Sequence, residues 1–101
     1  MGMMNTQAVQ HTPIPPAFTK KGFCYRQVRR QGDLAIFEQT RKDSEFKRYE
    51  VVKIGRHNGY TMGGAYIAPA ETYPGSSLWG ITGWTCTSIE DANKRFEAMQ
   101  Q

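Results

Sequence analysis

The chain has 101 residues, of which 13 are lysine or arginine and 9 are aspartate or glutamate, for a net charge of +4. This length allows one modest core and excludes a second domain of ordinary size. No run of residues approaches the apolar length of a membrane span, and the N-terminus lacks the basic start and apolar stretch of a signal peptide. We therefore expect a cytoplasmic protein with no membrane partner.

The charges are unevenly placed along the chain. Residues 20–56 carry eleven lysines or arginines against five acidic residues, whereas residues 57–101 carry two against four. The basic half is a candidate surface for a polyanion. The alternative is that charged strands only have solvated faces.

Residues 1–19 contain little that can pack, and their only ionisable side chain is His11. Pro13, Pro15 and Pro16 cannot donate the backbone hydrogen bonds of a helix or a sheet. We expect residues 1–21 to form a flexible N-terminal arm, followed by a single domain over residues 22–101.

Three strands are predicted in the basic half. Aromatic and β-branched residues mark 23–30 as the first strand, which ends at a short turn around Gly32. Residues 34–40 form the second strand, and residues 46–56 form the third and longest strand.

Asn58-Gly59 follows the third strand and is a strong hairpin signal. It predicts that residues 60–67 pair back on the third strand. Gly63-Gly64 inside this fourth strand suggests a bulge. The prolines of residues 68–78 predict an irregular connection.

The C-terminal part has the clearest local signals. Residues 84–87 alternate as a short fifth strand, and Ser88 is a good N-cap for a helix. Glu90 and Asp91 place negative charge in its first turn, where the helix dipole favours it. The helix carries one apolar stripe of Ile89, Ala92, Phe96 and Met99.

The predicted fold class is therefore α+β: a four- to five-stranded antiparallel meander sheet with one C-terminal helix packed on one face. One helix covers one face only. The other face must be solvated, paired in an oligomer or used for binding.

Alternation in the first strand divides its side chains between the two faces. Phe23, Tyr25, Gln27 and Arg29 are expected on one side, and Cys24, Arg26, Val28 and Arg30 on the other. Neither side is cleanly polar. This favours either a second face of aromatic and basic residues, as single-stranded nucleic acid binding uses, or a second face packed under the 68–83 loop.

Catalysis is not expected. The chain has two histidines, one in the expected arm and one beside the Asn-Gly turn, and no phosphate loop or nucleophile elbow. Cys24 and Cys86 match no metal spacing, so we expect two free thiols, no metal and no cofactor.

Our leading hypothesis is a non-enzymatic binding module that contacts nucleic acid through its basic strands. The expected contacts are Lys20, Lys21, Tyr25, Arg26, Arg29, Arg30, Lys47, Arg48, Tyr49 and Lys53.

Two alternatives use other surfaces. A protein-binding adaptor or inhibitor would use the aromatic loop of residues 66–84, with Tyr66, Tyr73, Leu78 and Trp79 as its contacts. A homodimer would join two copies through the uncovered sheet face.

Residues 73–96 resemble two kinds of known protein. Trp79-Gly80-Ile81-Thr82-Gly83, followed by a helix with Ser88, Ala92 and Phe96, resembles part of the WGR domain, which is a DNA-binding module. Ile81 stands where that family has arginine. The pattern Tyr73-Pro74, Trp79-Gly80 and Gly83-Trp84-Thr85 resembles short uncharacterised proteins of bacteria, phages and prophages, which implies an origin but no activity.

Overall fold

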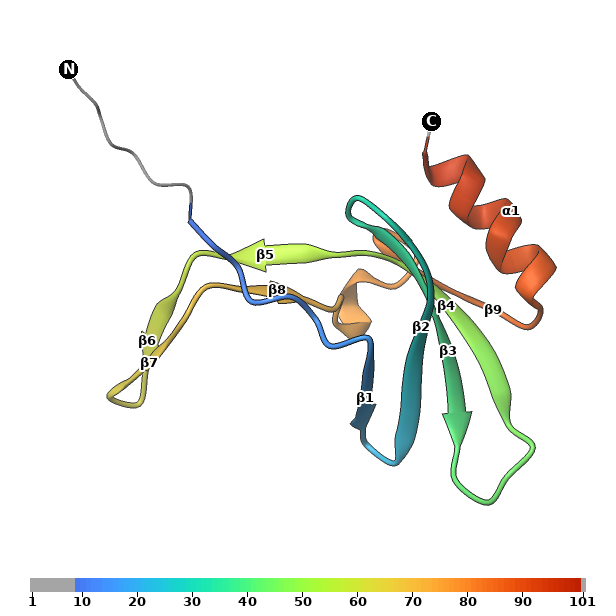
Figure 1. Cartoon of the computed structure of the whole chain (residues 1–101), viewed down its shortest axis with the longest axis horizontal. Helices are drawn as coiled ribbons and strands as arrows, with labels where there is room; N and C mark the ends of the chain where they lie inside the picture. The colour runs from blue at the N-terminus through green and yellow to red at the C-terminus, as the bar shows by residue number, and fades with distance from the viewer. Residues whose placement is uncertain (1–8, 101) are drawn as a thin grey trace.

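The computed structural model describes residues 9–100, and its body is an antiparallel sheet with one helix (Figure 1). Five strands make the sheet, in the order β1-β2-β3-β4-β9. Their bounds are Ala17–Lys20 (β1), Phe23–Gln31 (β2), Leu34–Arg41 (β3), Lys47–Lys53 (β4) and Gly83–Cys86 (β9). The helix α1, Ile89–Met99, packs on one face. The α+β prediction is confirmed.

The helix begins where its sequence signals place it. The Ser88 Oγ accepts a hydrogen bond from the Asp91 backbone N–H at 3.1 Å, which satisfies one of the free donors of the first turn. Ala92 and Phe96 are fully buried against Ile36 and Val51 of the sheet. We call this side of the sheet the helix face. Within residues 9–100, no helix is long and apolar enough to cross a membrane.

The opposite side of the sheet has its own core. Ala35, Phe37, Val52 and Ile54 are buried there. The residues that pack on them come from the N-terminal segment, from β2 and from the connection after β8: Ile14, Phe18, Tyr25, Tyr73 and Trp79. The alternative in which residues of the 68–83 loop cover this side is therefore confirmed in its main feature. We call this side the pocket face.

Residues 55–72 form a two-stranded arm that projects from the body (Figure 1). Strand β5, Gly55–His57, pairs with β8, Ala70–Thr72, and β6, Tyr60–Met62, pairs with β7, Ala65–Ile67. The prediction that residues 60–67 pair with the third strand is wrong, because β3 and β9 occupy both edges of β4.

The turn of the arm is Gly63-Gly64, where the sequence suggested a bulge. Both glycines have positive φ, 59° and 81°, as a two-residue hairpin turn of this kind requires. Asn58-Gly59 instead lies between β5 and β6, within the outgoing side of the arm. The strongest local turn signal was therefore assigned to the wrong hairpin position.

The N-terminal segment differs from the expected flexible arm. Residues 17–20 form β1, which pairs with β2, and Thr12 forms an isolated bridge with Ala70 of the projecting arm. The Ile14 backbone N–H donates to the Glu71 carboxylate at 3.0 Å. Residues 1–8 of the expected arm lie outside the described residues.

A β-bulge changes the faces of two arginines. The pairing of β2 with β3 shifts between Gln27 and Arg29, so that Val28 is the extra residue. Because one inserted residue reverses the alternation beyond it, Arg29 lies on the helix face and Arg30 on the pocket face. The sequence prediction had these two arginines exchanged.

Candidate functional site

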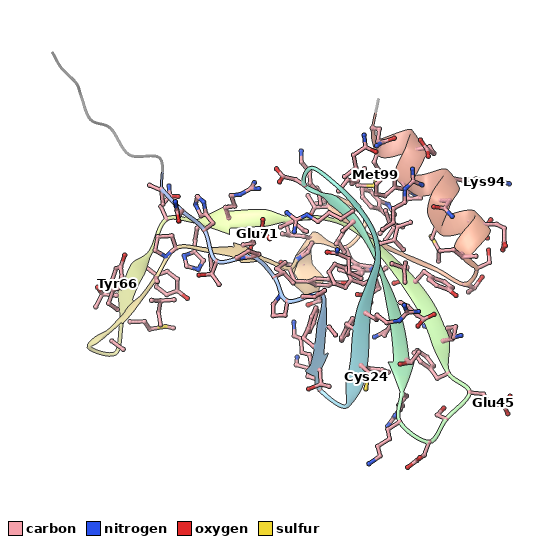
Figure 2. All side chains as sticks on the ribbon, viewed as in Figure 1. Cys24, Glu45, Tyr66, Glu71, Lys94 and Met99 are labelled. Carbon is pink, nitrogen blue, oxygen red and sulfur yellow. The ribbon has the colours of Figure 1, made fainter. Side chains whose placement is uncertain are left out.

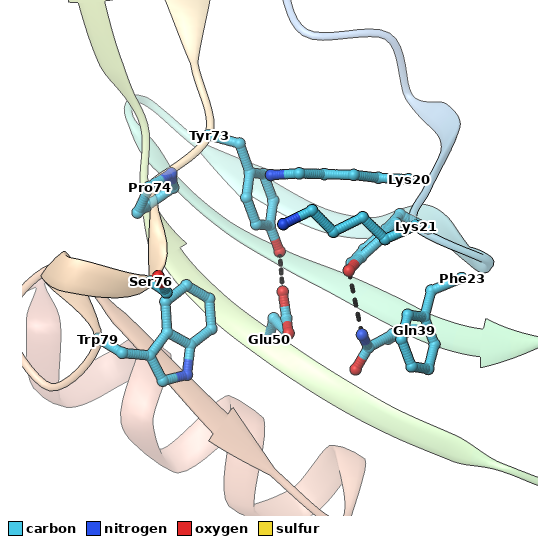
Figure 3. Close-up of a pocket in the computed structure, with 10 residues that line it drawn as sticks. Lys20, Lys21, Phe23, Gln39, Glu50, Tyr73, Pro74, Ser76 and Trp79 are labelled. Carbon is cyan, nitrogen blue, oxygen red and sulfur yellow. Dashed lines mark hydrogen bonds between the residues drawn. The ribbon is translucent and has the colours of Figure 1, made fainter.

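The pocket face holds an open pocket of about 350 Å³ (Figure 3). Segments far apart in the sequence meet there: the β1–β2 turn, strands β2, β3 and β4, and residues 73–79. The lining residues are Lys20, Lys21, Phe23, Tyr25, Gln39, Glu50, Tyr73, Pro74, Ser76 and Trp79. The volume lies at the lower end of the usual range for small-ligand sites, about 300–1,000 Å³.

Two lysines stand at the mouth of the pocket on a tight turn. Lys20 pairs with Phe23, which leaves Lys21 and Gly22 as the two central residues of the β1–β2 hairpin. Both have positive φ, 52° and 84°. Glycine adopts this conformation freely, whereas for lysine it costs roughly 1–2 kcal/mol. The hairpin therefore holds an exposed lysine in a backbone conformation where asparagine or glycine would be more stable.

The floor of the pocket is polar although it is nearly sealed. Gln39 and Glu50 are each only 8% exposed. The Tyr73 hydroxyl donates to Glu50 Oε1 at 2.5 Å, and Gln39 Nε2 donates to the Tyr25 hydroxyl at 3.0 Å. Figure 3 shows both bonds crossing the same pocket. Buried polar groups are almost always hydrogen-bonded, and here the partners are two phenols of the same pocket.

Burial and the Glu50 carboxylate shift the pKa values of the side chains in the pocket floor. Burial raises the pKa of Glu50 above its ordinary value, although the Tyr73 hydrogen bond and the Lys20 charge oppose the shift. Burial and the negative charge of Glu50 raise the pKa of the Tyr73 hydroxyl. They also raise the pKa of Tyr25. Both phenols therefore remain protonated and act as hydrogen-bond donors or acceptors at neutral pH.

Trp79 forms one wall of the pocket and is held by the next strand. Its Nε1 donates to Thr85 Oγ1 at 2.9 Å. A Cβ atom on Gly83 would come within 2.5 Å of the Trp79 ring, so only glycine at that position allows the ring to lie where it does. The Trp-Gly stretch of the sequence thus fixes an aromatic wall over β4.

Two arginines extend the positive charge of the pocket mouth along the same face. Arg41 pairs with Phe23 in the register of the sheet, and its guanidinium lies 5.4 Å from the Phe23 ring centre. The Arg48 guanidinium lies 4.9 Å from the centre of the Phe46 ring. Among residues 9–100, no carboxylate lies within ion-pair distance of Lys20, Lys21, Arg41 or Arg48.

The other predicted basic contacts are distributed differently. Arg26 and Lys47 share Glu38 on the helix face, at 3.1 and 3.7 Å. Arg29 donates to Glu97 of α1 at 2.6 Å and its guanidinium lies 3.9 Å from the Phe96 ring centre.

Arg30 makes two hydrogen bonds to Glu71, at 2.8 and 2.7 Å. Tyr49 packs against the helix-side core, so its ring is not free to stack. Lys53 is exposed. It lies opposite Leu34 in the register of β3 and β4, and because Leu34 belongs to the helix-side core, Lys53 is on the helix face. Of the ten predicted contacts, the structure thus brings only Lys20, Lys21 and Tyr25 together at the pocket. Arg30 and Arg48 lie on the same face outside the pocket lining, and Arg30 is bound to Glu71.

The residues of the predicted protein-binding loop also separate. Tyr73 and Trp79 line the pocket. Tyr66 lies on the projecting arm, far along it from the body (Figure 2), and is 67% exposed. Leu78 lies in the short 3₁₀-helix η1, Ser76–Leu78, and is exposed.

Sequence reasoning missed Phe23, Gln39, Arg41 and Glu50 as site residues. Only their register on neighbouring strands brings them together: Tyr25 pairs with Gln39, and Phe23 with Arg41. The one available sequence signal was Lys20-Lys21-Gly22, a glycine-containing turn just after a Phe-Thr pair, which could have indicated the β1–β2 hairpin.

The two cysteines are free, as expected, and both are half-buried. Burial raises the pKa of the Cys86 thiol. Within residues 9–100, no group of three or more His, Cys, Asp or Glu side chains is placed to hold a metal ion.

Comparison with protein families, curated proteins and solved structures gives no match to this chain. The likenesses to the WGR domain and to short phage proteins therefore stay predictions.

Proposed function

We propose that this protein is a non-enzymatic module that binds single-stranded nucleic acid across its pocket face. The observation that carries the proposal is a combination of two features on one face of the sheet: four cations with no carboxylate within ion-pair distance among residues 9–100, and an aromatic-walled pocket. Single-strand binding uses these two elements: cations follow the phosphates and aromatic rings stack on bases.

The distribution of ion pairs supports this choice of face. On the helix face, Arg26, Arg29 and Lys47 already have acidic partners, so binding a phosphate there would compete with existing contacts. On the pocket face, Lys20 and Lys21 stand at the mouth, and no carboxylate of residues 9–100 lies within ion-pair distance of either. In the proposed complex they meet the phosphates that flank a base in the pocket, and Arg41 and Arg48 meet phosphates further along the strand.

The direct test is fluorescence anisotropy of a labelled single strand of about 16 nucleotides, the upper end of the site size of small single-strand binding domains. We expect log affinity to fall linearly with log salt, with a slope of about 0.7 for each phosphate contact. A duplex of the same length should bind more weakly, because its bases are stacked and cannot enter the pocket. Absence of single-strand binding at low salt contradicts the proposal.

A matched pair of double variants locates the surface. Lys20→Ala with Lys21→Ala should lower the slope by about 0.7 for each lysine removed. Lys53→Ala with Lys94→Ala removes the same charge from exposed sites away from the pocket and should leave the slope unchanged. Equal effects of the two pairs would mean that only net charge matters.

A second candidate, protein binding, rests on the projecting arm. Tyr60, Met62 and Tyr66 are exposed by 45, 62 and 67%, and residues 58–70 contain no charged side chain. An uncharged ribbon with exposed large side chains is suited to a partner with an apolar surface and not to a polyanion.

The arm is tested by capture of a partner protein after nuclease treatment. Met62→Ser with Tyr66→Ser should abolish capture, whereas Trp79→Ala should not, because Trp79 lies in the body. If Trp79→Ala alone abolishes capture, the pocket and not the arm is the protein-binding surface.

A further inference from the structure

We propose that the pocket selects guanine among the nucleobases, an inference that rests on the proposed binding of single strands at this face. The floor of the pocket brings together four polar side chains: Glu50, Gln39, Tyr25 and Tyr73. Gln39 and Glu50 are polar side chains at positions that are only 8% exposed, where a polar group costs free energy unless it is hydrogen-bonded.

The Glu50 carboxylate can accept more hydrogen bonds than the protein gives it. Glu50 Oε1 accepts the Tyr73 hydroxyl, and Oε2 receives no hydrogen bond from the described residues. Oε2 is not completely enclosed by the protein. An ionised carboxylate accepts about four hydrogen bonds. Glu50 can therefore still accept from two N–H groups of a ligand.

The Tyr25 hydroxyl is a hydrogen-bond donor beside the Glu50 carboxylate. The Tyr25 hydroxyl accepts a hydrogen bond from Gln39 Nε2, and its own proton has no acceptor among residues 9–100. The carboxylate is near enough that its charge contributes to the raised pKa of Tyr25, so this phenol keeps its proton. The floor thus presents one hydroxyl donor next to one carboxylate acceptor.

The nucleobases differ in the hydrogen-bond donors and acceptors on their Watson–Crick edges. Guanine has an acceptor, O6, followed by two adjacent donors, the N1–H and N2 amino groups. Adenine and cytosine place an unprotonated ring nitrogen beside their amino group, and the carboxylate would repel its lone pair. Thymine and uracil flank a single N–H with two carbonyl oxygens. Guanine alone matches one donor and a carboxylate that accepts twice.

The walls and mouth suit the same ligand. Trp79, Tyr73 and Phe23 supply aromatic surfaces for a flat base. Figure 3 shows the Lys20 and Lys21 side chains extending toward Tyr73. In the proposed complex these two cations meet the 5′ or 3′ phosphate of the bound nucleotide. A cationic ligand would also meet the carboxylate, but the two lysines at the mouth disfavour it.

The test compares three single strands by anisotropy at one salt concentration: all-thymine, thymine with one central guanine, and thymine with hypoxanthine in place of that guanine. The guanine strand should bind about tenfold more tightly than the all-thymine strand, the effect of a good bidentate base contact. Hypoxanthine lacks the N2 amino group, so its strand should fall between the two. This comparison needs no protein variant.

A matched pair of variants assigns the selectivity to the floor. With Glu50→Gln, the guanine and thymine strands should bind alike. With Glu38→Gln, which changes a neighbouring-strand carboxylate on the helix face, the preference for guanine should remain about tenfold. Guanine preference that survives Glu50→Gln overturns the assignment.

The possible failures are distinguishable. If all three strands bind equally and with a steep salt dependence, the guanine inference is wrong and the proposed single-strand binding stands. If no strand binds at low salt, the proposed function itself is wrong, and the inference falls with it. Tighter binding of the hypoxanthine strand than of the guanine strand also overturns the inference, because it contradicts a contact to the N2 amino group.

Discussion

The two faces of the sheet use the same kinds of residues in opposite ways. On the helix face, Phe96 is fully buried and the Arg29 guanidinium is enclosed between its ring and the Glu97 carboxylate. On the pocket face, Phe23 and Arg41 lie together at the surface, and the buried groups include Glu50. Ion-paired charges and buried aromatic rings stabilise a fold. Unpaired charges beside accessible aromatic rings, together with a buried carboxylate, are typical of a binding site.

The largest difference between the faces should appear when one aromatic ring is removed from each. Phe96→Ala leaves a cavity under α1 and should lower the free energy of unfolding by about 3–5 kcal/mol. Phe23→Ala removes a half-exposed ring and should cost clearly less while weakening single-strand binding. Urea unfolding of both variants checks this, and equal destabilisation would contradict the division of the faces.

The next effect concerns Glu71, which holds Arg30 of the pocket face and the Ile14 backbone. The Arg30 hydrogen bonds lower the pKa of Glu71 from 4.5 to about 2. A carboxylate with a lowered pKa stabilises the folded state above its ordinary pKa and loses this contribution as the pH falls through the folded value. We expect a loss between about pH 4.5 and pH 2 of at most about 3.4 kcal/mol.

Glu71→Gln should remove this contribution at pH 7 and flatten the acid dependence in unfolding curves. The control is Glu97→Gln, which breaks the Arg29 pair on the helix face. Since the Glu97 side chain is 59% exposed, that change should cost less than about 1 kcal/mol. A larger cost for Glu97→Gln than for Glu71→Gln would reverse the assigned roles.

A smaller effect is expected at the hairpin that carries the lysines. Lys21→Asn places a residue that tolerates positive φ at that position, so the free energy of unfolding should rise by about 1 kcal/mol. The same change should lower the salt slope of single-strand binding by about 0.7. Lys42→Asn, in the exposed β3–β4 turn, serves as the charge-matched control and should change neither. Lower stability of Lys21→Asn would show that the lysine is not strained.

The smallest expected effect is at the pocket floor. Because burial raises the pKa of Glu50, its protonated form favours the folded state. This contribution is present below pH 4.5 and is lost as the pH rises through the raised pKa. Glu50→Gln should therefore slightly increase stability at pH 7. A large loss of stability in thermal unfolding would mean that the ionised carboxylate is structural.

The homodimer hypothesis is connected to the same comparison. It needs an uncovered sheet face, and Ile14, Phe18, Tyr73 and Trp79 now occupy much of the pocket face. It stays a prediction, which sedimentation at several protein concentrations tests.

The sequence by itself determined the elements whose signals are local. Ser88, the apolar stripe of α1 and the extent of β3 each depend on residues within a few positions, and all are where the sequence placed them. The α+β class followed from their order. One alternation failed, in β2, because a bulge at Val28 changes the face of every later residue and leaves no sequence mark.

Tertiary structure decided the partners of the strands and the composition of the site. Asn58-Gly59 and Gly63-Gly64 are both acceptable turns locally, and only pairing along the whole arm selects the second. Strand β1 forms because Phe18 stacks on Tyr25 and packs on Phe37, contacts that no local pattern predicts. Glu50 and Gln39 become a pocket floor because β4 and β3 place them beside Tyr73 and Tyr25, which arrive from the distant residue 73 connection and from β2. Sequence patterns record which face a residue prefers, whereas a site is a set of long-range neighbours that the register of the folded sheet alone specifies.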